Sequence, residues 1–480
     1  MSKISNAFKR FPKTFWAANT MELFERWAWY GLFLVLALYL TKSKDAGALG
    51  FSQEQKGSIM GTVSAILYFL PVITGSIADK LGYKKVLLLS FGILSSGYLV
   101  MGWLTDYYSV FMIFLFIAVG GALFKPVISA TIAKTTDESN SSIGFGIFYM
   151  MVNLGAFIGP IIASKLRELD WQYVFYMSAG IILVNVILVL FFYKEPERGE
   201  SEETLAKSIK RSLFNIYITL KDYRFLIFLV LIVGFWSMYL QLFFTLPVFI
   251  DQWMDTSSVY KVLHNISPAI ARAIGTEQQT VNPEMITNID ALYIVLFQVL
   301  ISSIVMRFKP LYAMIIGIFI SATGIGLMFL TNNALFLIPS IFVFAVGEMA
   351  TSPKITEYIG RIAPKDKVGL YMGASFLPMS GGNYVAGQLS GTVYGGMSDK
   401  FNLLRNELES RSINLPELSE NYTKTDFMNE ALQKLDMSQH ELTNYLWQQY
   451  HPEHIWMVFT SIGVITGIGL LFYNRFLLKG

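Results

Sequence analysis

Long apolar stretches alternate with short polar stretches along most of the chain. A helix needs roughly 20 mainly apolar residues to cross the hydrocarbon part of a bilayer, and stretches of at least that length recur about twelve times. We predict membrane-spanning helices at residues 13–40, 53–79, 84–104, 108–133, 143–164, 172–193, 225–250, 288–306, 310–331, 335–360, 368–395 and 455–474. Several exceed the minimal length, which indicates tilt or cytoplasmic extension. The pattern predicts an all-α membrane protein with twelve transmembrane helices.

The composition favours the same class. Of the 480 residues, 54% are hydrophobic and only 15% are charged, and the mean hydropathy is +0.48. These values are typical of a membrane protein with many spans and not of a soluble enzyme. The net charge of +3 is small, and no basic patch interleaved with aromatic residues stands out, so we expect no nucleic-acid partner. The lack of cysteine excludes disulfides, thiolate catalysis and cysteine metal sites.

The positive residues predict the orientation in the membrane. Lys and Arg are in excess in the loops that lie in the cytoplasm if both termini are cytoplasmic, including the short segments 307–309 and 361–367. The start of the chain is basic, but no small-residue cleavage site follows a short apolar core. We therefore expect a retained first helix and an integral protein of the cell (inner) membrane.

The long polar segments divide the chain into two halves. We predict an N-terminal six-helix bundle at 1–193, a cytoplasmic linker at 194–223 with an amphipathic helix at 205–220, and a C-terminal six-helix bundle at 224–480. The two bundles would be related by pseudo-symmetry. Segments 251–287 and 396–453 would lie outside. The second of these is interpreted as a small helical cap, with helical stretches at 401–408 and 427–435.

A glycine-containing loop joins the second and third predicted spans. It reads Gly75-x-x-x-Asp79-x-x-Gly82-x-Lys84. The glycines allow a tight turn, the aspartate can cap the next helix, and the lysine holds the loop in the cytoplasm. A plain basic turn would do the same. Together with twelve spans, however, the complete spacing resembles the loop motif of the major facilitator superfamily.

Three charged residues lie in the first predicted span, where nearly everything else is apolar. Glu22, Glu25 and Arg26 are spaced i, i+3 and i+4, so they share one face of a helix. Ionised side chains at membrane depth are costly and usually functional. This face must line a polar interior, and two carboxylates beside a guanidinium suggest proton handling.

Two more charges lie deep in predicted spans of opposite halves. Lys125 is in the fourth span and Glu348 is in the tenth. A pair between them would bridge the halves across a central cavity. The alternative is that each side chain extends to a nearby interface. Their central positions favour the cavity.

Other polar residues in the spans give weaker signals. Asp290 is either a helix cap or a cavity residue, and Asn153 is either a contact between helices or a ligand contact. Hydroxyl or amide groups that could face a cavity come from Tyr30, Tyr68, Tyr239 and Gln241, although aromatic residues in membrane helices more often serve packing.

The four histidines, His264, His440, His451 and His454, all fall in the outer loops. The His-x-x-His spacing at 451–454 would suit a metal ion, but no other ligands cluster with it in the sequence. We favour ordinary loop histidines and expect neither a metal site nor a cofactor.

Several motifs together resemble the proton-dependent oligopeptide transporters. Glu22-x-x-Glu25-Arg26 is similar to that family's ExxERFxYY signature, and Phe148-Tyr149-x-x-Val152-Asn153-x-Gly155 is similar to FYxxINxG. Further similarities, in chain order, are Phe124-Lys125-Pro126 to FKPNIS, Phe235-Trp236 with Gln241 to the seventh helix, Gly347-Glu348 with Ser352-Pro353 to GExxxSP, and Gly382-Asn383-Tyr384 to the eleventh helix. The resemblance covers essentially the whole membrane part and leaves 396–453 unexplained.

The resemblance implies a monomeric proton-coupled symporter that imports small peptides by alternating access. Glu22 and Glu25 would take part in proton coupling, and Arg26 would tune their proton affinity. Lys125 and Glu348 would form a pair that breaks and reforms during the cycle. The peptide site implied in this way comprises Tyr30, Phe33, Tyr68, Lys125, Asn153, Gln241, Asp290, Glu348 and Ser375.

Five positions depart from the family pattern, and one of them is Ala291, which replaces a proline. Phe33 replaces a second arginine that helps to hold the peptide carboxylate, Val127 replaces the asparagine of FKPN, Asp290 replaces an asparagine, and Ser375 replaces a tryptophan. Losing one cation and gaining one anion changes the charge of the cavity by about two units, a large change in a low dielectric. We expect a substrate with a stronger cationic group, or one without a free carboxylate.

Other protein classes find less support. No nucleophile with a base and no metal-ligand cluster lies in a predicted span, so we do not expect an enzyme or a catalytic residue. A channel would need a repeated pore-lining pattern, which is absent from the sequence. The main alternative is a proton-coupled transporter of a non-peptide, cationic small solute on the same fold.

Overall fold

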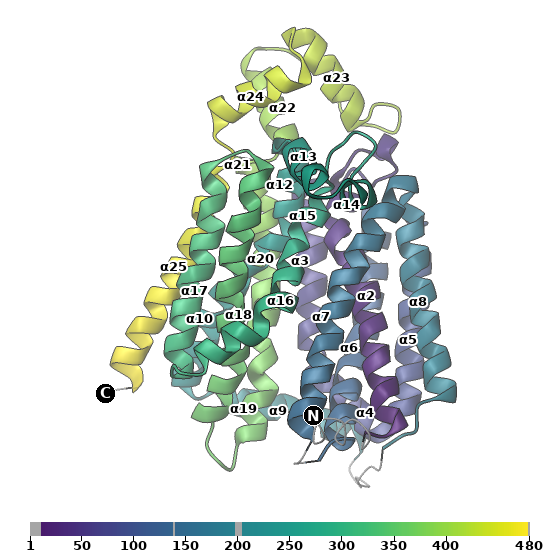
Figure 1. Ribbon diagram of the computed structural model, residues 1–480, viewed down its shortest axis with the longest axis vertical. Helices are drawn as coiled ribbons and strands as arrows, with labels where there is room; N and C mark the ends of the chain where they lie inside the picture. The colour runs from purple at the N-terminus through teal and green to yellow at the C-terminus, as the bar shows by residue number, and fades with distance from the viewer. Residues whose placement is uncertain (1–10, 138–139, 197–203, 479–480) are drawn as a thin grey trace. The chain divides into compact units, whose positions relative to one another are not determined.

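The computed structural model describes residues 11–137, 140–196 and 204–478, and the regular elements of these residues are helices (Figure 1). The first ten residues, which carry the predicted basic start, lie outside the described residues. The predicted all-α membrane architecture is confirmed.

Ten helical segments among the described residues are long and apolar enough to cross a membrane. They are built on α2 (Lys13–Thr41), α5 (Tyr83–Met101), α6 (Tyr107–Lys134), α7 (Ser141–Leu169), α8 (Trp171–Phe191), α10 (Tyr223–Tyr239), α16 (Ile289–Val305), α17 (Pro310–Leu327), α18 (Leu337–Ile362) and α25 (His454–Phe472). The predicted span 53–79 is a bent pair, α3 (Gln53–Phe69) and α4 (Pro71–Leu81), with an angle of 47°. Pro71 starts the second helix, where its missing N–H does least harm.

The predicted span 368–395 is a series of shorter pieces. These are α19 (Val368–Gly373), a 3₁₀ turn at Ala374–Phe376, α20 (Leu377–Gln388), a π-helical stretch at Leu389–Val393 and α21 (Tyr394–Met397). The sequence of this region is rich in glycine and serine, which are weak helix formers. Hydropathy alone did not predict these interruptions.

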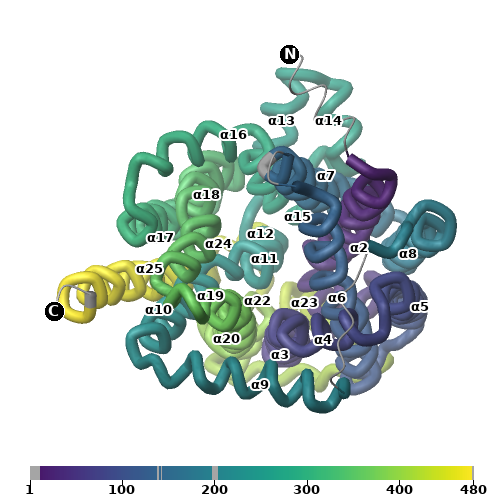
Figure 2. The backbone as a smooth tube through the Cα atoms, turned by 90° about the horizontal axis from the view of Figure 1, so that it is seen from below, coloured from purple at the N-terminus to yellow at the C-terminus, as the bar shows by residue number. Residues whose placement is uncertain are grey.

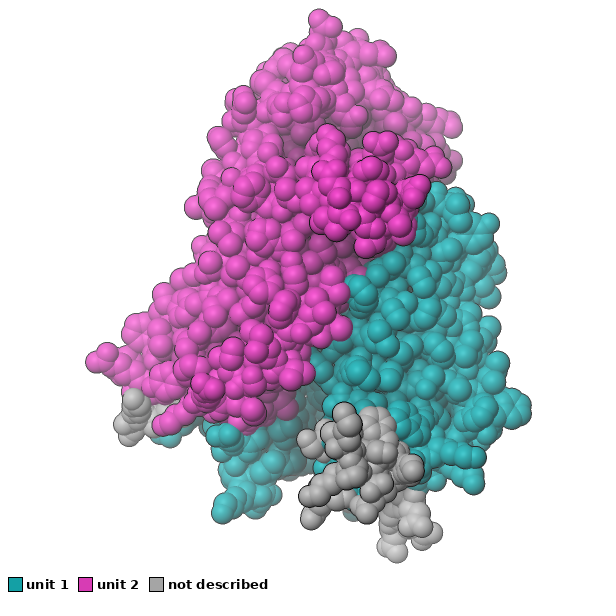
Figure 3. Space-filling model, in the orientation of Figure 1, with its two compact units in different colours: residues 1–32, 63–229, 359–380 teal, residues 33–62, 230–358, 381–480 magenta. Residues whose placement is uncertain are grey.

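The chain forms two compact units, which Figure 3 shows in different colours. Unit 1 comprises Met1–Leu32, Val63–Leu229 and Ile359–Ser380, and unit 2 comprises Phe33–Thr62, Val230–Tyr358 and Gly381–Gly480. These groupings differ from the predicted division at 193 and 224, because α2 and α3 each contribute to both units. The division into six-helix bundles at 1–193 and 224–480 therefore stays a prediction.

Glycines explain why the start of α3 belongs to unit 2. A Cβ added to Gly57 would lie 2.2 Å from the carbonyl oxygen of Gly387, and one added to Gly61 would lie 2.7 Å from the Cα of Gly387. Only glycine allows two helix backbones to approach so closely. The first two turns of α3 are thus packed directly on α20.

The predicted amphipathic linker helix is confirmed as α9 (Leu205–Leu220) in unit 1. Ile216 and Thr219 are buried, whereas Phe214 and Tyr217 are exposed. Figure 2 shows α9 along its length and α5 and α6 close to end-on, so α9 lies across the spans of its unit. This placement is typical of a helix at a membrane interface.

The two long polar segments of unit 2 contain helices. Segment 251–287 contains α13 (Ser257–Ile266), α14 (Pro268–Ile274) and α15 (Pro283–Thr287), and segment 396–453 contains α22 (Lys400–Ser410), α23 (Lys424–Leu435) and α24 (Gln439–Tyr450). The two helical stretches predicted in 396–453 are confirmed. Capping boxes begin two of these helices, Thr423 with Asp426 for α23 and Ser438 with Glu441 for α24. The caps satisfy backbone donors and define where each helix starts.

A buried carboxylate holds the helices of segment 396–453 together. Glu407 on α22 accepts hydrogen bonds from the hydroxyls of Tyr445 (2.7 Å) and Tyr450 (2.8 Å) and from Nε of Arg411 (2.7 Å). Burial raises the pKa of Glu407, but these hydrogen bonds and the Arg411 charge outweigh it, and the net pKa lies below the ordinary value. The ionised form is therefore favoured in the fold.

We expect Glu407→Gln to destabilise segment 396–453 at pH 7 by about 1–2 kcal/mol, because charge-assisted bonds to two hydroxyls and a guanidinium are weakened. A carboxyl group whose pKa is lowered by folding stabilises the fold above its unfolded pKa, and this stabilisation is lost as the pH falls through the lowered value. Thermal unfolding should therefore show a difference from the unsubstituted chain at pH 7 that shrinks below about pH 4.

Glu409→Gln is the matched control on the same helix. Glu409 is exposed and forms a solvent-exposed ion pair with Arg405 at 3.4 Å, so its substitution should leave thermal unfolding nearly unchanged. Equal effects of the two substitutions at pH 7 would contradict the role of Glu407.

Candidate functional site

The three charges of α2 form one buried cluster in unit 1. Nε of Arg26 donates to Oε2 of Glu25 at 2.6 Å, and the Nη2 group of Arg26 pairs with the same carboxylate. Oε1 of Glu22 lies 3.4 Å from Nε of Arg26. Each of the three residues is less than a tenth exposed. The prediction that they share one helix face is confirmed, and the guanidinium lies between two carboxylates.

Glycines of α7 bring its backbone against α2 at the depth of this cluster. A Cβ on Gly155 would lie 2.3 Å from the carbonyl oxygen of Leu23 and 2.9 Å from Cβ of Arg26. A Cβ on Gly159 would lie 2.4 Å from the carbonyl oxygen of Trp27. Small residues one helix turn apart are the usual means of close packing between membrane helices. The contact orients the face that carries Arg26.

Residues from α3 and α6 complete the surroundings of the cluster. Nζ of Lys125 lies 3.8 Å from the centroid of the Tyr68 ring, a cation–π contact. The guanidinium of Arg26 lies 5.9 Å from the centroid of the Tyr30 ring. Gly121 on α6 lies beside Glu25: a Cβ there would lie 4.0 Å from its Oε1, an ordinary contact, and 3.0 Å from the side chain of Leu67. Six of the predicted site residues therefore gather in unit 1: Glu22, Glu25, Arg26, Tyr30, Tyr68 and Lys125.

Two other predicted residues of unit 1 bond to their own helical segments. Nδ2 of Asn153 donates to the carbonyl oxygen of Tyr149 at 2.8 Å, and Oγ of Ser375 donates to that of Met372 at 2.7 Å. These bonds satisfy part of each polar side chain locally. Their roles in binding stay predictions.

Two carboxyl groups meet in unit 2. The carboxyl groups of Asp290 on α16 and Glu348 on α18 lie within hydrogen-bonding reach of each other, and the hydroxyl of Tyr239 on α10 lies within reach of Glu348. Both acids are less than a tenth exposed. A hydrogen bond between two carboxyl groups requires a proton on one of them. The pair can therefore hold a proton.

The Asp290–Glu348 pair helps to decide whether Asp290 is a helix cap or an interior residue. Asn288 is the N-cap residue of α16, and Asp290 lies within the first turn with its side chain directed to another helix. The contacts thus favour the interior position over the helix cap. Oδ1 of Asp290 and Oε2 of Glu348 are buried and have no hydrogen-bond partner among the described residues, so each could accept a bond from a ligand.

The seventh predicted span of unit 2 is broken near Gln241. It continues from α10 as α11 (Gln241–Phe244) and α12 (Leu246–Trp253). The Gln241 amide donates to the carbonyl oxygens of Ser237 (2.9 Å) and Ala386 (3.4 Å), and its oxygen accepts from Thr245 (2.6 Å). Gln241 therefore ties the broken helix to α20. The side chain of Phe33 is buried, with its ring 5.8 Å from that of Phe244.

The proposed Lys125–Glu348 pair joins residues of different compact units. Its formation during a transport cycle stays a prediction.

Two buried polar residues were not predicted from the sequence. Tyr98 of unit 1 is fully buried with a hydroxyl that has no partner among the described residues, and Lys56 of unit 2 is fully buried in α3. A lone tyrosine or lysine near a span end gave no signal of this burial.

In the structure, Glu453 joins the two histidines of the His-x-x-His segment as a third candidate ligand for a metal ion. Ligand atoms of His451, Glu453 and His454 lie within 4.8 Å of one another. Nδ1 of His451 already contacts Oε1 of Glu453 at 3.1 Å, and α25 begins at His454. The positive end of a helix opposes a cation. The interpretation as ordinary loop histidines stays our prediction.

The sequence profile of the Major Facilitator Superfamily matches residues 20–275. Dipeptide and tripeptide permease A of Escherichia coli (strain K12) is 33% identical over 191 residues, which cover 39% of this chain and 37% of that protein. The chain thus aligns with little more than a third of that relative. Dipeptide and tripeptide permease A of Cronobacter turicensis is 25% identical over 431 residues, which cover 80% of this chain and 85% of that protein.

A solved structure described as a POT family transporter in complex with 5-aminolevulinic acid has a TM-score of 0.68. Its sequence is 18% identical, and the match covers 96% of this chain and 99% of that chain. At this identity the likeness shows the fold alone. With the similarity to the peptide permeases, it confirms the resemblance found in the motifs.

We expect Gly155→Ala to impair the site, because the added methyl group would force α7 away from Leu23 and Arg26. Overpacking of this kind costs about 1–3 kcal/mol. Thermal unfolding and ligand binding by the purified protein would measure the effect.

Gly146→Ala is the matched control on the same helix, since a Cβ at Gly146 meets nothing within 4 Å. It should leave both properties unchanged. A Gly155→Ala variant as stable and active as Gly146→Ala would show that the close contact between α2 and α7 is not required.

Proposed function

Because this chain belongs to the Major Facilitator Superfamily, we propose that it is a proton-coupled symporter that imports di- or tripeptides, or related small peptide-like solutes, by alternating access. The observation that carries the proposal is the buried cluster of Glu22, Glu25 and Arg26 in a chain similar to dipeptide and tripeptide permeases. The protein is an integral membrane protein. We further propose an inner-membrane location, cytoplasmic termini and a monomer.

The cluster offers a means of linking a proton to a change of shape. While Glu25 is ionised, it holds the Arg26 guanidinium through two contacts. Protonation removes the negative charge and weakens the pair, which frees Arg26 for another partner. Glu22, 3.4 Å away, is then the remaining carboxylate beside the buried guanidinium, which needs a second anion to replace Glu25. A substrate carboxylate would meet this need.

The pair of Asp290 and Glu348 offers a complementary site for a cationic group. A substrate ammonium that approached the two acids could take the place of the shared proton and bind the resulting carboxylates. Each acid has one buried oxygen that has no partner among the described residues and could accept a hydrogen bond from the substrate. Asp290 therefore supports a preference for substrates that carry an amine.

The alternative function is proton-coupled transport of a non-peptide cationic solute. The specific observation is Phe33, whose ring is buried beside Phe244 where the family has an arginine for a peptide carboxylate. One protein of similar fold is described in complex with 5-aminolevulinic acid, which is not a peptide. Competition between unlabelled dipeptides and small amines for uptake into proteoliposomes would distinguish the two functions.

We expect Glu25→Gln to abolish uptake driven by a proton gradient, because a neutral amide cannot take up and release the proton. Accumulation of substrate in proteoliposomes should fall by at least about tenfold, equal to 1.4 kcal/mol. Glu168→Gln is the control, since Glu168 is a carboxylate of unit 1 paired with Lys165 at a partly exposed site. Uptake that ignores a collapsed proton gradient would contradict proton coupling.

We expect Asp290→Asn to weaken binding of cationic substrates and to favour ordinary neutral dipeptides. Removing one negative charge near a ligand ammonium should change the ratio of the two affinities by about tenfold or more. Competition assays with a neutral dipeptide and a dipeptide amide measure this ratio. Tight, coupled transport of neutral dipeptides by the unsubstituted chain would refute the proposed cationic preference.

A further inference from the structure

Three lysines at the outer end of unit 2 donate to backbone carbonyl groups near helix ends. Lys56 donates to Phe244 at 3.1 Å, where α11 ends before α12. Lys400 donates to Gln252 at 3.1 Å, near the end of α12. Lys424 donates to both Thr41 (3.0 Å) and Phe51 (2.9 Å). The carbonyls of Phe244, Gln252 and Thr41 are among the last of their helices, which lack partners within the helix and carry the negative end of its dipole, so they favour cations. Phe51 instead precedes α3.

Lys424 joins segment 396–453 to the connection between α2 and α3. Thr41 ends α2, and Phe51 precedes α3 by two positions. The capping box of α23 fixes the backbone at Lys424, and the Lys424 ammonium also lies 5.6 Å from the Phe401 ring centroid. The backbone N–H of Thr425 donates to Oγ of Ser43 at 3.2 Å. The start of α23 is therefore held to this connection by several bonds.

Asp399 forms a second connection between segment 396–453 and the start of α3. Its Oδ1 accepts a hydrogen bond from Gln53 on α3 and one from Gln252 on α12, both at 2.7 Å. Its Oδ2 accepts from the backbone N–H of Asn402 and caps α22. One buried carboxylate thus connects α3, α12 and α22.

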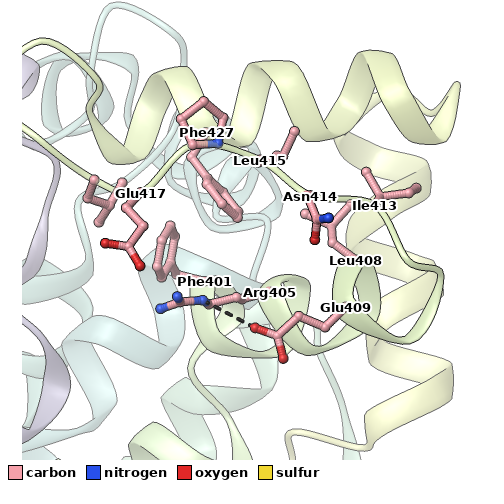
Figure 4. Close-up of a pocket in the computed structure, with 11 residues that line it drawn as sticks. Phe401, Arg405, Leu408, Glu409, Ile413, Asn414, Leu415, Glu417 and Phe427 are labelled. Carbon is pink, nitrogen blue, oxygen red and sulfur yellow. Dashed lines mark ion pairs between the residues drawn. The ribbon is translucent and has the colours of Figure 1, made fainter.

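Segment 396–453 also has its own interior. The rings of Phe401 and Phe427 lie 4.9 Å apart between α22 and α23. Beside them is a cavity of about 350 Å³, whose lining side chains Figure 4 shows, with an ion pair between Arg405 and Glu409 at its edge. Glu407 also joins α22 to α24 through Tyr445 and Tyr450. We infer from these internal contacts that the segment supports Lys424 and Asp399.

We propose that segment 396–453 is an outer clasp, in which Lys424 and Asp399, assisted by Lys56, position the outer ends of α2 and α3 on unit 2 and restrain opening at this end of the transporter. The inference rests on the proposed function. Since α2 and α3 both continue into unit 1, an alternating-access cycle that opens this end must release residues 33–62 from unit 2. Lys424 makes two of the bonds that would have to break.

The clasp acts beside a close backbone contact between two helices of unit 2. Gly57 and Gly61 of α3 lie against the backbone of Gly387, one to two turns from Gln53. Packing between glycines has no side chains that interlock across it, so bonds at the end of α3 are well placed to determine how long the contact lasts. Losing a charge-assisted hydrogen bond shifts such an equilibrium by about tenfold.

The chain contains no cysteine, so a single introduced thiol can report on opening. Ser390→Cys is suitable because Ser390 is fully buried in the π-helical stretch beside this contact. In Ser390→Cys reconstituted in proteoliposomes, the rate of labelling by a membrane-impermeant maleimide from the outer side is measured with and without Lys424→Met. We expect Lys424→Met to raise the rate about tenfold.

Lys434→Met is the matched control, an exposed lysine on the same helix α23, and it should leave the rate unchanged. Lys424→Arg retains donors for the two carbonyls and should stay near the rate of the Ser390→Cys parent. Equal labelling in Lys424→Met and Lys434→Met would overturn the clasp, and so would Lys424→Arg labelling as fast as Lys424→Met. Size-exclusion profiles and circular dichroism confirm that each variant is folded before rates are compared.

Uptake by the Ser390→Cys parent is measured in the same vesicles. If the parent takes up no peptide or amine while Lys424→Met still labels faster, the proposed function fails and the clasp stands. If the parent transports but the labelling rates are equal, the clasp fails and the proposed function stands.

Discussion

An ionised side chain in a hydrocarbon environment must have a partner, and this constraint determines how unit 1 is built. Glu22, Glu25 and Arg26 cannot face lipid, so α2 has to lie inside its unit. Burial then demands close neighbours, which Gly155 and Gly159 of α7 supply by bringing backbone against backbone. The buried ion pair therefore depends on the glycines, because without close packing around it the pair would be solvated or strained.

Unit 2 meets the same constraint in a different way. Its two buried acids, Asp290 and Glu348, face each other, and each keeps one buried oxygen with no partner among the described residues. Three of its lysines, Lys56, Lys400 and Lys424, donate to backbone carbonyls near helix ends. Breaks in a membrane helix are costly unless their freed polar groups find partners. At the break between α11 and α12, Lys56 both satisfies a freed carbonyl and joins α3 to the broken helix.

The local part of this organisation could be predicted from the sequence, because it depends only on short-range geometry. The i, i+3, i+4 spacing of Glu22, Glu25 and Arg26 placed them on one face, and the structure confirms their contact. Amphipathic spacing likewise predicted α9, which the structure also shows. The interruptions of 368–395 were missed because apolar content does not report whether a helix continues through glycine and serine.

Contacts between residues far apart in the chain were beyond such reasoning. Lys56 and Phe244 are separated by 188 positions, and nothing around Lys56 in the sequence distinguishes a buried lysine from an exposed one. Asp290 could equally have been a cap, and only its contact with Glu348 favours the interior.

The sequence by itself determined the membrane class, the helix faces and the family resemblance, because hydropathy, periodicity and motif spacing are properties of neighbouring residues. Only the tertiary structure decided which buried charges meet, since pairing depends on how separate helices pack.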